Sequence, residues 1–101
     1  LKDGGSAVCL IKPQFEAGRE NVGKKGVVKD QRVHIRVIKN VCSDAVQAGF
    51  SVSALDFSPV KGPEGNIEYL VYLKKDEAQS ISAPDVAGVV SAAHACFKAG
   101  E

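Results

Sequence analysis

The chain has 101 residues, a length that fits one domain with a modest core, whereas an α/β enzyme with a parallel sheet usually needs about half as much again. Hydrophobic residues make up 45% and charged residues 25% of the sequence, which is typical of a soluble globular protein, and no apolar run is long enough for a membrane span or signal peptide. The net charge of +1 provides no overall basic field, so any contact with nucleic acid must be local.

The first predicted element is a short buried strand. Residues 7–11 are a continuous apolar run, too short for a helix and without alternation, which is typical of a central parallel strand buried on both faces. Pro13 ends the strand because proline lacks the amide hydrogen that a sheet requires, so Lys12 lies at its carboxyl end. Since this strand starts so close to Leu1 and the chain contains no Met, we expect the sequence to be a fragment of a longer protein.

A long polar loop is predicted over residues 14–29. Gly18, Gly23 and Gly26 lie among charged residues, and the apolar positions have too little periodicity for a core element. Loops of this length are uncommon in a compact domain unless they act as lids or binding loops. We therefore expect this loop to be mobile and to carry part of the function.

A helix is predicted over residues 31–48. Asp30 is a suitable N-cap, and valines recur at four-residue steps from Val33 to Val41, as on the buried face of an amphipathic helix. Gly49 is a suitable left-handed terminator for this helix.

Two strands and a last helix complete the predicted elements. Residues 50–57 and 67–73 are rich in branched and aromatic side chains, and the short stretch between them has turn chemistry, so the two strands must be antiparallel. Residues 82–85 resemble a capping box with proline in the first turn, which predicts a terminal helix that reaches Gly100.

The order strand, helix, strand, strand, helix predicts an α/β fold. The Rossmann-like fold of S-adenosylmethionine-dependent methyltransferases ends in such an antiparallel strand hairpin, with the last strand between its two predecessors, and by this analogy the chain would be the carboxyl-terminal half of that fold. Residues 1–75 would belong to the methyltransferase domain, and residues 76–101 would form a linker and the terminal helix.

Cysteines and histidines show no pattern typical of a disulfide, a metal site or a nucleophile. Cys9, Cys42 and Cys96 are widely spaced within apolar segments, so we expect reduced thiols that act as small buried hydrophobic side chains. His34 and His94 lie on predicted helices without a partner at catalytic or metal spacing, so we expect both to be structural.

Lys12 and Glu68 are polar residues that interrupt the strand edges. The carboxyl end of a parallel strand and the amino end of an antiparallel strand lie at the same rim of a sheet, and open α/β sheets bind ligands at such a rim. If the last strand inserts beside the first, the two residues would lie on strands about 5 Å apart, close enough for the ammonium and carboxylate to interact. Such a pair could hold and deprotonate a hydroxyl nucleophile, or it could be a structural ion pair.

Two stretches of the sequence resemble the hemolysin A family. Residues 9–16, Cys-Leu-Ile-Lys-Pro-Gln-Phe-Glu, together with the glycine-containing stretch that ends at Asp30, look like one block of that family. Residues 58–68, which end in Asn-Ile-Glu, look like another. These proteins resemble FtsJ-like RNA ribose 2′-O-methyltransferases, and the resemblance covers about residues 7–75.

The resemblance implies a cytoplasmic enzyme that uses S-adenosyl-L-methionine to methylate a ribose of RNA, in particular ribosomal RNA. In that family a Lys-Asp-Lys-Glu tetrad orients the 2′-hydroxyl, and the resemblance assigns the second lysine to Lys12, as base or orienter, and the glutamate to Glu68, which would align it. The first lysine, the aspartate, the cofactor-binding loop and an S4-type RNA-binding domain would lie upstream of Leu1. The isolated chain is therefore expected to bind the cofactor weakly and to be inactive.

Partners could bind at the loops near this rim. Five cations there could contact RNA phosphates or could be solvated surface charge: Arg19, Lys24, Lys25, Lys29 and Lys61. Tyr69 and Tyr72 are expected to pack in the sheet, and an open sheet edge could promote self-association.

The alternative to an enzyme is a non-enzymatic module that binds RNA or a protein. No segment has the pattern of a membrane-surface helix or of a membrane span, so nothing in the sequence supports the membrane lysis that the family name implies.

Overall fold

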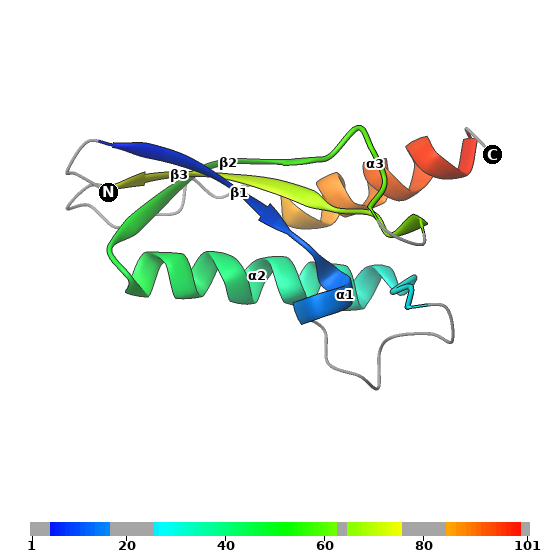
Figure 1. The fold of residues 1–101 in the computed structure, drawn as a ribbon, viewed down its shortest axis with the longest axis horizontal. Coiled ribbons are helices and arrows are strands. Elements are labelled where there is room, and N and C mark those ends of the chain that lie inside the picture. The colour runs from blue at the N-terminus through cyan, green and yellow to red at the C-terminus, as the bar shows by residue number, and fades with distance from the viewer. Residues whose placement is uncertain (1–4, 17–25, 63–64, 76–84, 100–101) are drawn as a thin grey trace.

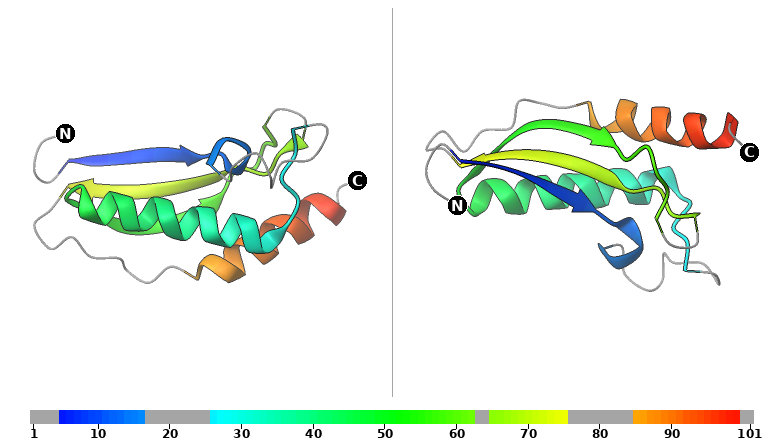
Figure 2. Two further views of the ribbon diagram at one scale, coloured as in Figure 1. Left: turned by 90° about the horizontal axis from the view of Figure 1, so that it is seen from below. Right: turned by 45° about the horizontal axis from the view of Figure 1, so that its top comes forward.

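The protein is a small antiparallel sheet packed against two long helices. The computed structural model describes residues 5–16, 26–62, 65–75 and 85–99. Within them the element order is β1 (Ser6–Ile11), α1 (Pro13–Glu16), α2 (Gln31–Gln47), β2 (Phe50–Phe57), β3 (Tyr69–Lys75) and α3 (Val86–Ala99). Helix α2 covers one face of the sheet (Figure 1). Helix α3 lies beside α2 and along β2, and β1 forms the opposite edge of the sheet (Figure 2).

The last strand is inserted between the two earlier ones. The strand order is β1-β3-β2, and β3 pairs antiparallel with both neighbours. Tyr69 at the start of β3 is opposite Ile11 in one ladder and Phe57 in the other. The predicted antiparallel hairpin and the predicted position of the last strand are therefore confirmed.

Helix α2 forms where its local signals indicate. The Asp30 side chain accepts a hydrogen bond of 2.9 Å from the amide of Arg32, as an N-cap does, and the two side chains also form an ion pair. The carboxyl end leads into Gly49, whose φ of 98° lies in the left-handed region that glycine favours. Buried residues recur on one face, which packs on β2: Val33, His34, Val37, Ile38 and Cys42.

The hydrophobic core fills the space between α2, α3 and the inner face of the sheet. Its members come from every long element, and Val90 and Ala93 bring α3 into it. Val28 is also buried, although it lies in the predicted polar loop, so that the end of this loop belongs to the core. The loop begins with the short helix α1, and its residues 17–25 lie outside the described ranges, so the mobility predicted for residues 14–29 stays a prediction.

Strand β1 is exposed, which corrects the expectation of a strand buried on both faces. Val8 and Leu10 are 58% and 48% exposed on the face turned away from α2, and Cys9 is also exposed. The reason is that β1 packs mainly against β3, while α2 and α3 cover β2. Cys96 on α3 is exposed as well, so only Cys42 is buried as expected, and burial raises the pKa of its thiol.

Two predicted boundaries were wrong by a few residues. Strand β3 begins at Tyr69, two residues later than predicted. Helix α3 begins at Val86. The carboxylate of Asp85 accepts a 3.0 Å hydrogen bond from the amide of Gly88, as the N-cap residue of a helix does. The N-cap therefore lies about one turn later than the predicted capping box, which begins at residue 82. None of the helices in the described ranges has the length and apolar character needed to cross a membrane.

Candidate active site

Lys12 and Glu68 extend from adjacent strands at one rim of the sheet. Lys12 directly follows Ile11, the last residue of β1, and Glu68 directly precedes Tyr69, the first residue of β3. Ile11 and Tyr69 are opposite each other in the ladder. The rim therefore brings together a lysine and a glutamate that are 56 positions apart in the sequence.

The carboxylate of Glu68 is buried and closely surrounded. Glu68 is 6% exposed, and its Oε2 accepts a 2.9 Å hydrogen bond from Nε2 of Gln14 on α1. Its backbone oxygen accepts a 2.8 Å hydrogen bond from the amide of Ser58. A Cβ atom on Gly62 would overlap the same carboxylate, so the hairpin backbone passes directly beside it. These contacts confine the carboxylate on both sides.

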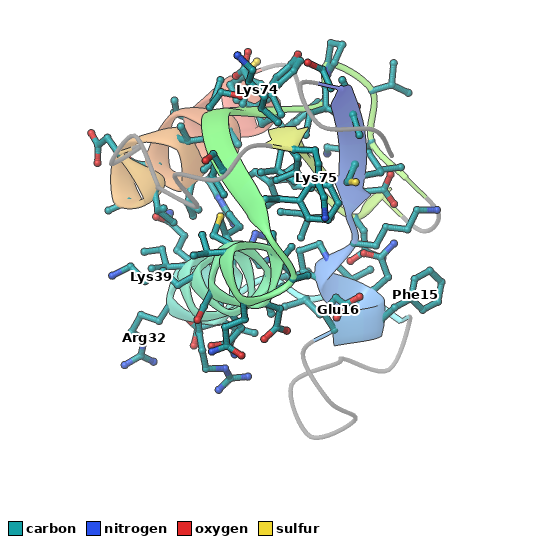
Figure 3. All side chains as sticks on the ribbon, turned by 90° about the vertical axis from the view of Figure 1, so that its left-hand side faces the viewer. Phe15, Glu16, Arg32, Lys39, Lys74 and Lys75 are labelled. Carbon is teal, nitrogen blue, oxygen red and sulfur yellow. The ribbon has the colours of Figure 1, made fainter. Side chains whose placement is uncertain are left out.

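Lys12 is partly buried and lies at the junction of β1 and α1. Its backbone oxygen accepts a 2.9 Å hydrogen bond from the amide of Phe15, which begins the helical turn. Its Nζ lies 5.8 Å from the centroid of the Phe15 ring. The Phe15 side chain is 72% exposed and points away from the body of the molecule (Figure 3). No ion pair joins the described side chains of Lys12 and Glu68.

Asn66 ties the end of the loop to the hairpin that leads into Glu68. Its Nδ2 donates to the backbone oxygen of Gly26 at 2.7 Å, and its Oδ1 accepts from the amide of Val28 at 3.0 Å. Its own backbone oxygen accepts a 2.8 Å hydrogen bond from the amide of Gly62. Because Asn66 is only 2% exposed, these bonds form away from water and fix the two segments relative to each other.

His34 links α2 to the same region through a neutral imidazole. Its Nε2 lies 2.8 Å from the backbone oxygen of Val28, which can only accept, so Nε2 carries the proton. Its Nδ1 then accepts from the hydroxyl of Tyr69 at 2.7 Å. Burial lowers the pKa of His34 and raises that of Tyr69, and both shifts favour this arrangement.

The two histidines lie against each other, which the sequence spacing did not indicate. The ring centroids of His34 and His94 are 4.8 Å apart, and Nδ1 of His94 donates to the backbone oxygen of Val90. Their hydrogen bonds to the backbone and to Tyr69 support the predicted structural role. Among the residues that the structure describes, no group of His, Cys, Asp and Glu side chains could hold a metal ion.

Two of the five predicted RNA-binding cations line one cavity. Lys29 and Lys61 border a cavity of about 380 Å³ together with His94 and Phe97, and Nζ of Lys61 lies 5.2 Å from the centroid of the Phe97 ring. The other three cations, Arg19, Lys24 and Lys25, lie outside the described ranges. A lining with two lysines is unsuited to the sulfonium cation of S-adenosylmethionine, so the cavity does not fit this cofactor.

Sequence reasoning missed three residues at this rim: Gln14, Gly62 and Asn66. Gln14 lies in the block that resembles the hemolysin A family, and its position two residues after Lys12 could have marked it. Gly62 and Asn66 lie in the second block that resembles this family, in a stretch whose residues taken alone indicate only a turn. Their contacts to Glu68 and to the loop depend on the tertiary fold, which no local pattern reveals.

Comparisons with known proteins show the family to which the chain belongs. The family model described as FtsJ-like methyltransferase matches residues 2–75. The chain is 42% identical to YqxC from Bacillus subtilis, over 97% of this chain and 36% of that protein. It is 36% identical to the 16S/23S rRNA (cytidine-2′-O)-methyltransferase TlyA from Mycobacterium tuberculosis, over 92% of this chain and 34% of TlyA. It is 43% identical to Hemolysin A from Brachyspira hyodysenteriae, over 64% of this chain and 27% of that protein.

A solved structure shares the same fold. A protein from Streptococcus thermophilus matches 99% of this chain with a TM-score of 0.94 and 46% identity, while the match covers 36% of that protein. The chain thus spans about a third of the length of the relatives that it matches. The family model covers most of the chain, and the resemblance noted in the sequence is confirmed: the chain belongs to the FtsJ-like methyltransferase family.

Proposed function

We propose that this chain is the carboxyl-terminal part of an S-adenosylmethionine-dependent enzyme that methylates ribose 2′-hydroxyls of ribosomal RNA. The main observation in favour is the position of Lys12 and the buried Glu68 at one rim of the sheet, within a chain of the FtsJ-like methyltransferase family. A related protein, TlyA, is named for cytidine 2′-O-methylation of 16S and 23S rRNA. The chain would then complete a Rossmann-like sheet whose earlier strands belong to the rest of the protein.

Lys12 and Glu68 would act on the hydroxyl that is methylated. A hydroxyl must approach a methyl sulfonium in line, so much of the rate comes from holding the oxygen in place. Lys12 would orient this hydroxyl and accept or share its proton. Glu68, confined by Gln14 and the Gly62 backbone, would supply the fixed negative charge that aligns the Lys12 side chain.

The methyl donor and the RNA would contact different parts of the protein. Since the cavity beside α3 does not suit a sulfonium cation, we assign the cofactor site to the rest of the protein, outside this chain. Lys29 and Lys61 would contact phosphates of the RNA, joined by Arg19, Lys24 and Lys25. A ribosomal RNA substrate would place the enzyme in the cytoplasm.

Nucleoside analysis of methylated RNA tests this function. The full-length protein would be incubated with S-adenosylmethionine and unmodified ribosomal RNA, and the RNA digested to nucleosides for mass spectrometry. We expect one or a few 2′-O-methylated nucleosides that are absent without protein. Methylation on the bases would contradict the proposed chemistry, and RNA binding without any methyl transfer would favour the non-enzymatic module.

A further inference from the structure

We propose that Gln14 is a positioning residue that holds the Glu68 carboxylate in its reactive orientation. This inference rests on the proposed function, because it assigns a role within the same site. Gln14 is the second residue after Lys12, and helix α1 turns its side chain back toward the amino end of β3. One short segment would thus provide both the lysine and the side chain that orients its partner carboxylate.

The chemistry of the two groups determines the direction of this hydrogen bond. A carboxylate oxygen accepts, so the nitrogen of the Gln14 amide must face Oε2 of Glu68, at a distance of 2.9 Å. The opposite amide orientation would bring two oxygens together. The bond joins residues 54 positions apart and lies in a partly buried place, where competition from water is reduced.

The other end of the amide argues against a purely structural role. Oε1 of Gln14 is buried and has no hydrogen-bond partner among the described residues. Buried polar atoms are nearly always paired, and a role in catalysis is one recognised reason for an exception. Within the described part of the chain, the bond to Glu68 is what holds this amide.

Gly62 limits the carboxylate from the other side. A side chain at this position would overlap Oε2 and Cδ of Glu68, so the carboxylate lies directly against the Gly62 backbone. Oε2 therefore has a donor on the α1 side and the hairpin backbone on the other. A carboxylate held in this way presents its remaining oxygen, Oε1, in a constant direction.

The test is a double-mutant cycle in the full-length enzyme, with single-turnover methylation of RNA as readout. Gln14→Met is close in size but cannot donate, so the carboxylate can rotate, and we expect the rate of transfer to fall about tenfold or more. The KM for RNA and the affinity for S-adenosylmethionine should stay within about twofold, since Gln14 acts on the reacting geometry. Gln47→Met, at an exposed position at the end of α2, is the matched control and should leave the rate unchanged.

The cycle distinguishes positioning from a structural effect. In a Glu68→Ala background there is no carboxylate to hold, so Gln14→Met should cause little further loss. An equal fractional loss with and without the carboxylate would overturn the inference. If Gln14→Met fails to fold, Gln14→Asn gives the same test, because it keeps the amide but withdraws it by one methylene. If the wild-type enzyme is active and Gln14→Met has the same rate, the role assigned to Gln14 is refuted and the proposed function stands. If the wild-type enzyme is inactive, the proposed function itself is refuted.

Discussion

Three polar side chains near the rim are buried, and each has a partner across the fold. Glu68 accepts from Gln14, Asn66 joins Gly26 and Val28, and His34 joins Val28 and Tyr69. Buried polar groups are tolerated when they are hydrogen-bonded, and removing one partner leaves the other unpaired at a cost of about 1–3 kcal/mol. The hydrogen bonds that stabilise this rim thus include the one that holds Glu68, the residue to which we assign a catalytic role.

His34 should make the stability of the protein depend on pH. Burial lowers the pKa of His34 in the folded state below the ordinary value of 6.5, so the unfolded chain binds the proton first as the pH falls. The free energy of unfolding should be steady above about pH 6.5 and should decrease below it, by at most about 1.4 kcal/mol per pH unit for one proton. Urea unfolding at a series of pH values measures this slope.

The variant His34→Gln supplies the control for this dependence. Glutamine cannot titrate, so the slope just below pH 6.5 should become flatter even though the variant is less stable throughout. An unchanged slope in His34→Gln would assign the dependence to another group and contradict this account of His34.

The sequence indicated the residues of the rim only in part. Lys12 and Glu68 could be found because each is a polar residue next to an apolar strand, and strand topology predicts which ends meet. Gln14 was not found, because its bond to Glu68 depends on the turn of α1. The contact between His34 and His94 was also missed, since it requires α3 to pack beside α2.

Among the elements, the hairpin and the end of the loop form one hydrogen-bonded unit centred on Asn66. In Asn66→Ala the amide of Val28 and the oxygen of Gly26 would lose their partners in a buried place, so we expect a loss of about 2 kcal/mol or more in the free energy of unfolding. Hydrogen exchange at the Val28 amide should become faster, because Asn66 is its acceptor.

The exposed Asn40 on α2 provides the matched substitution. Asn40→Ala removes the same side chain from the surface of a helix and should change stability by less than about 0.5 kcal/mol. Equal effects of the two substitutions, or an unchanged exchange rate at Val28, would show that Asn66 does not hold the loop.

Elements with strong local signals were predicted well. Strand β2 has the predicted bounds, and α2 has the predicted cap at Asp30. The start of β3 was misplaced because Ile67 and Glu68 continue the apolar and branched pattern of the strand, although Glu68 bonds to Ser58 and Gln14 outside the ladder. The exposure of β1 could not be predicted, because an apolar strand does not reveal which of its faces other segments cover.

At the scale of the whole molecule, the sheet has one covered and one open face. Val8, Leu10 and Tyr72 are exposed on the face turned away from α2, and the outer edge of β1 has no partner strand among the described residues. Since the chain spans about a third of its relatives, we propose that the rest of the protein covers this surface. Without such a cover, an open apolar edge strand favours self-association.

The most direct test of the proposed function is to substitute Lys12 in the full-length protein. In single-turnover methylation of ribosomal RNA, Lys12→Ala should lower the rate by about 10² or more, the scale typical of a lost acid–base group, while the melting temperature and cofactor affinity stay near those of the wild type. Glu68→Gln should lower the rate less, and the double variant should lose less than the product of the two effects. Lys39→Ala, on the exposed side of α2 (Figure 3), should have the wild-type rate. A folded Lys12→Ala protein with the wild-type rate and a lowered melting temperature would show that Lys12 is structural and would contradict the account.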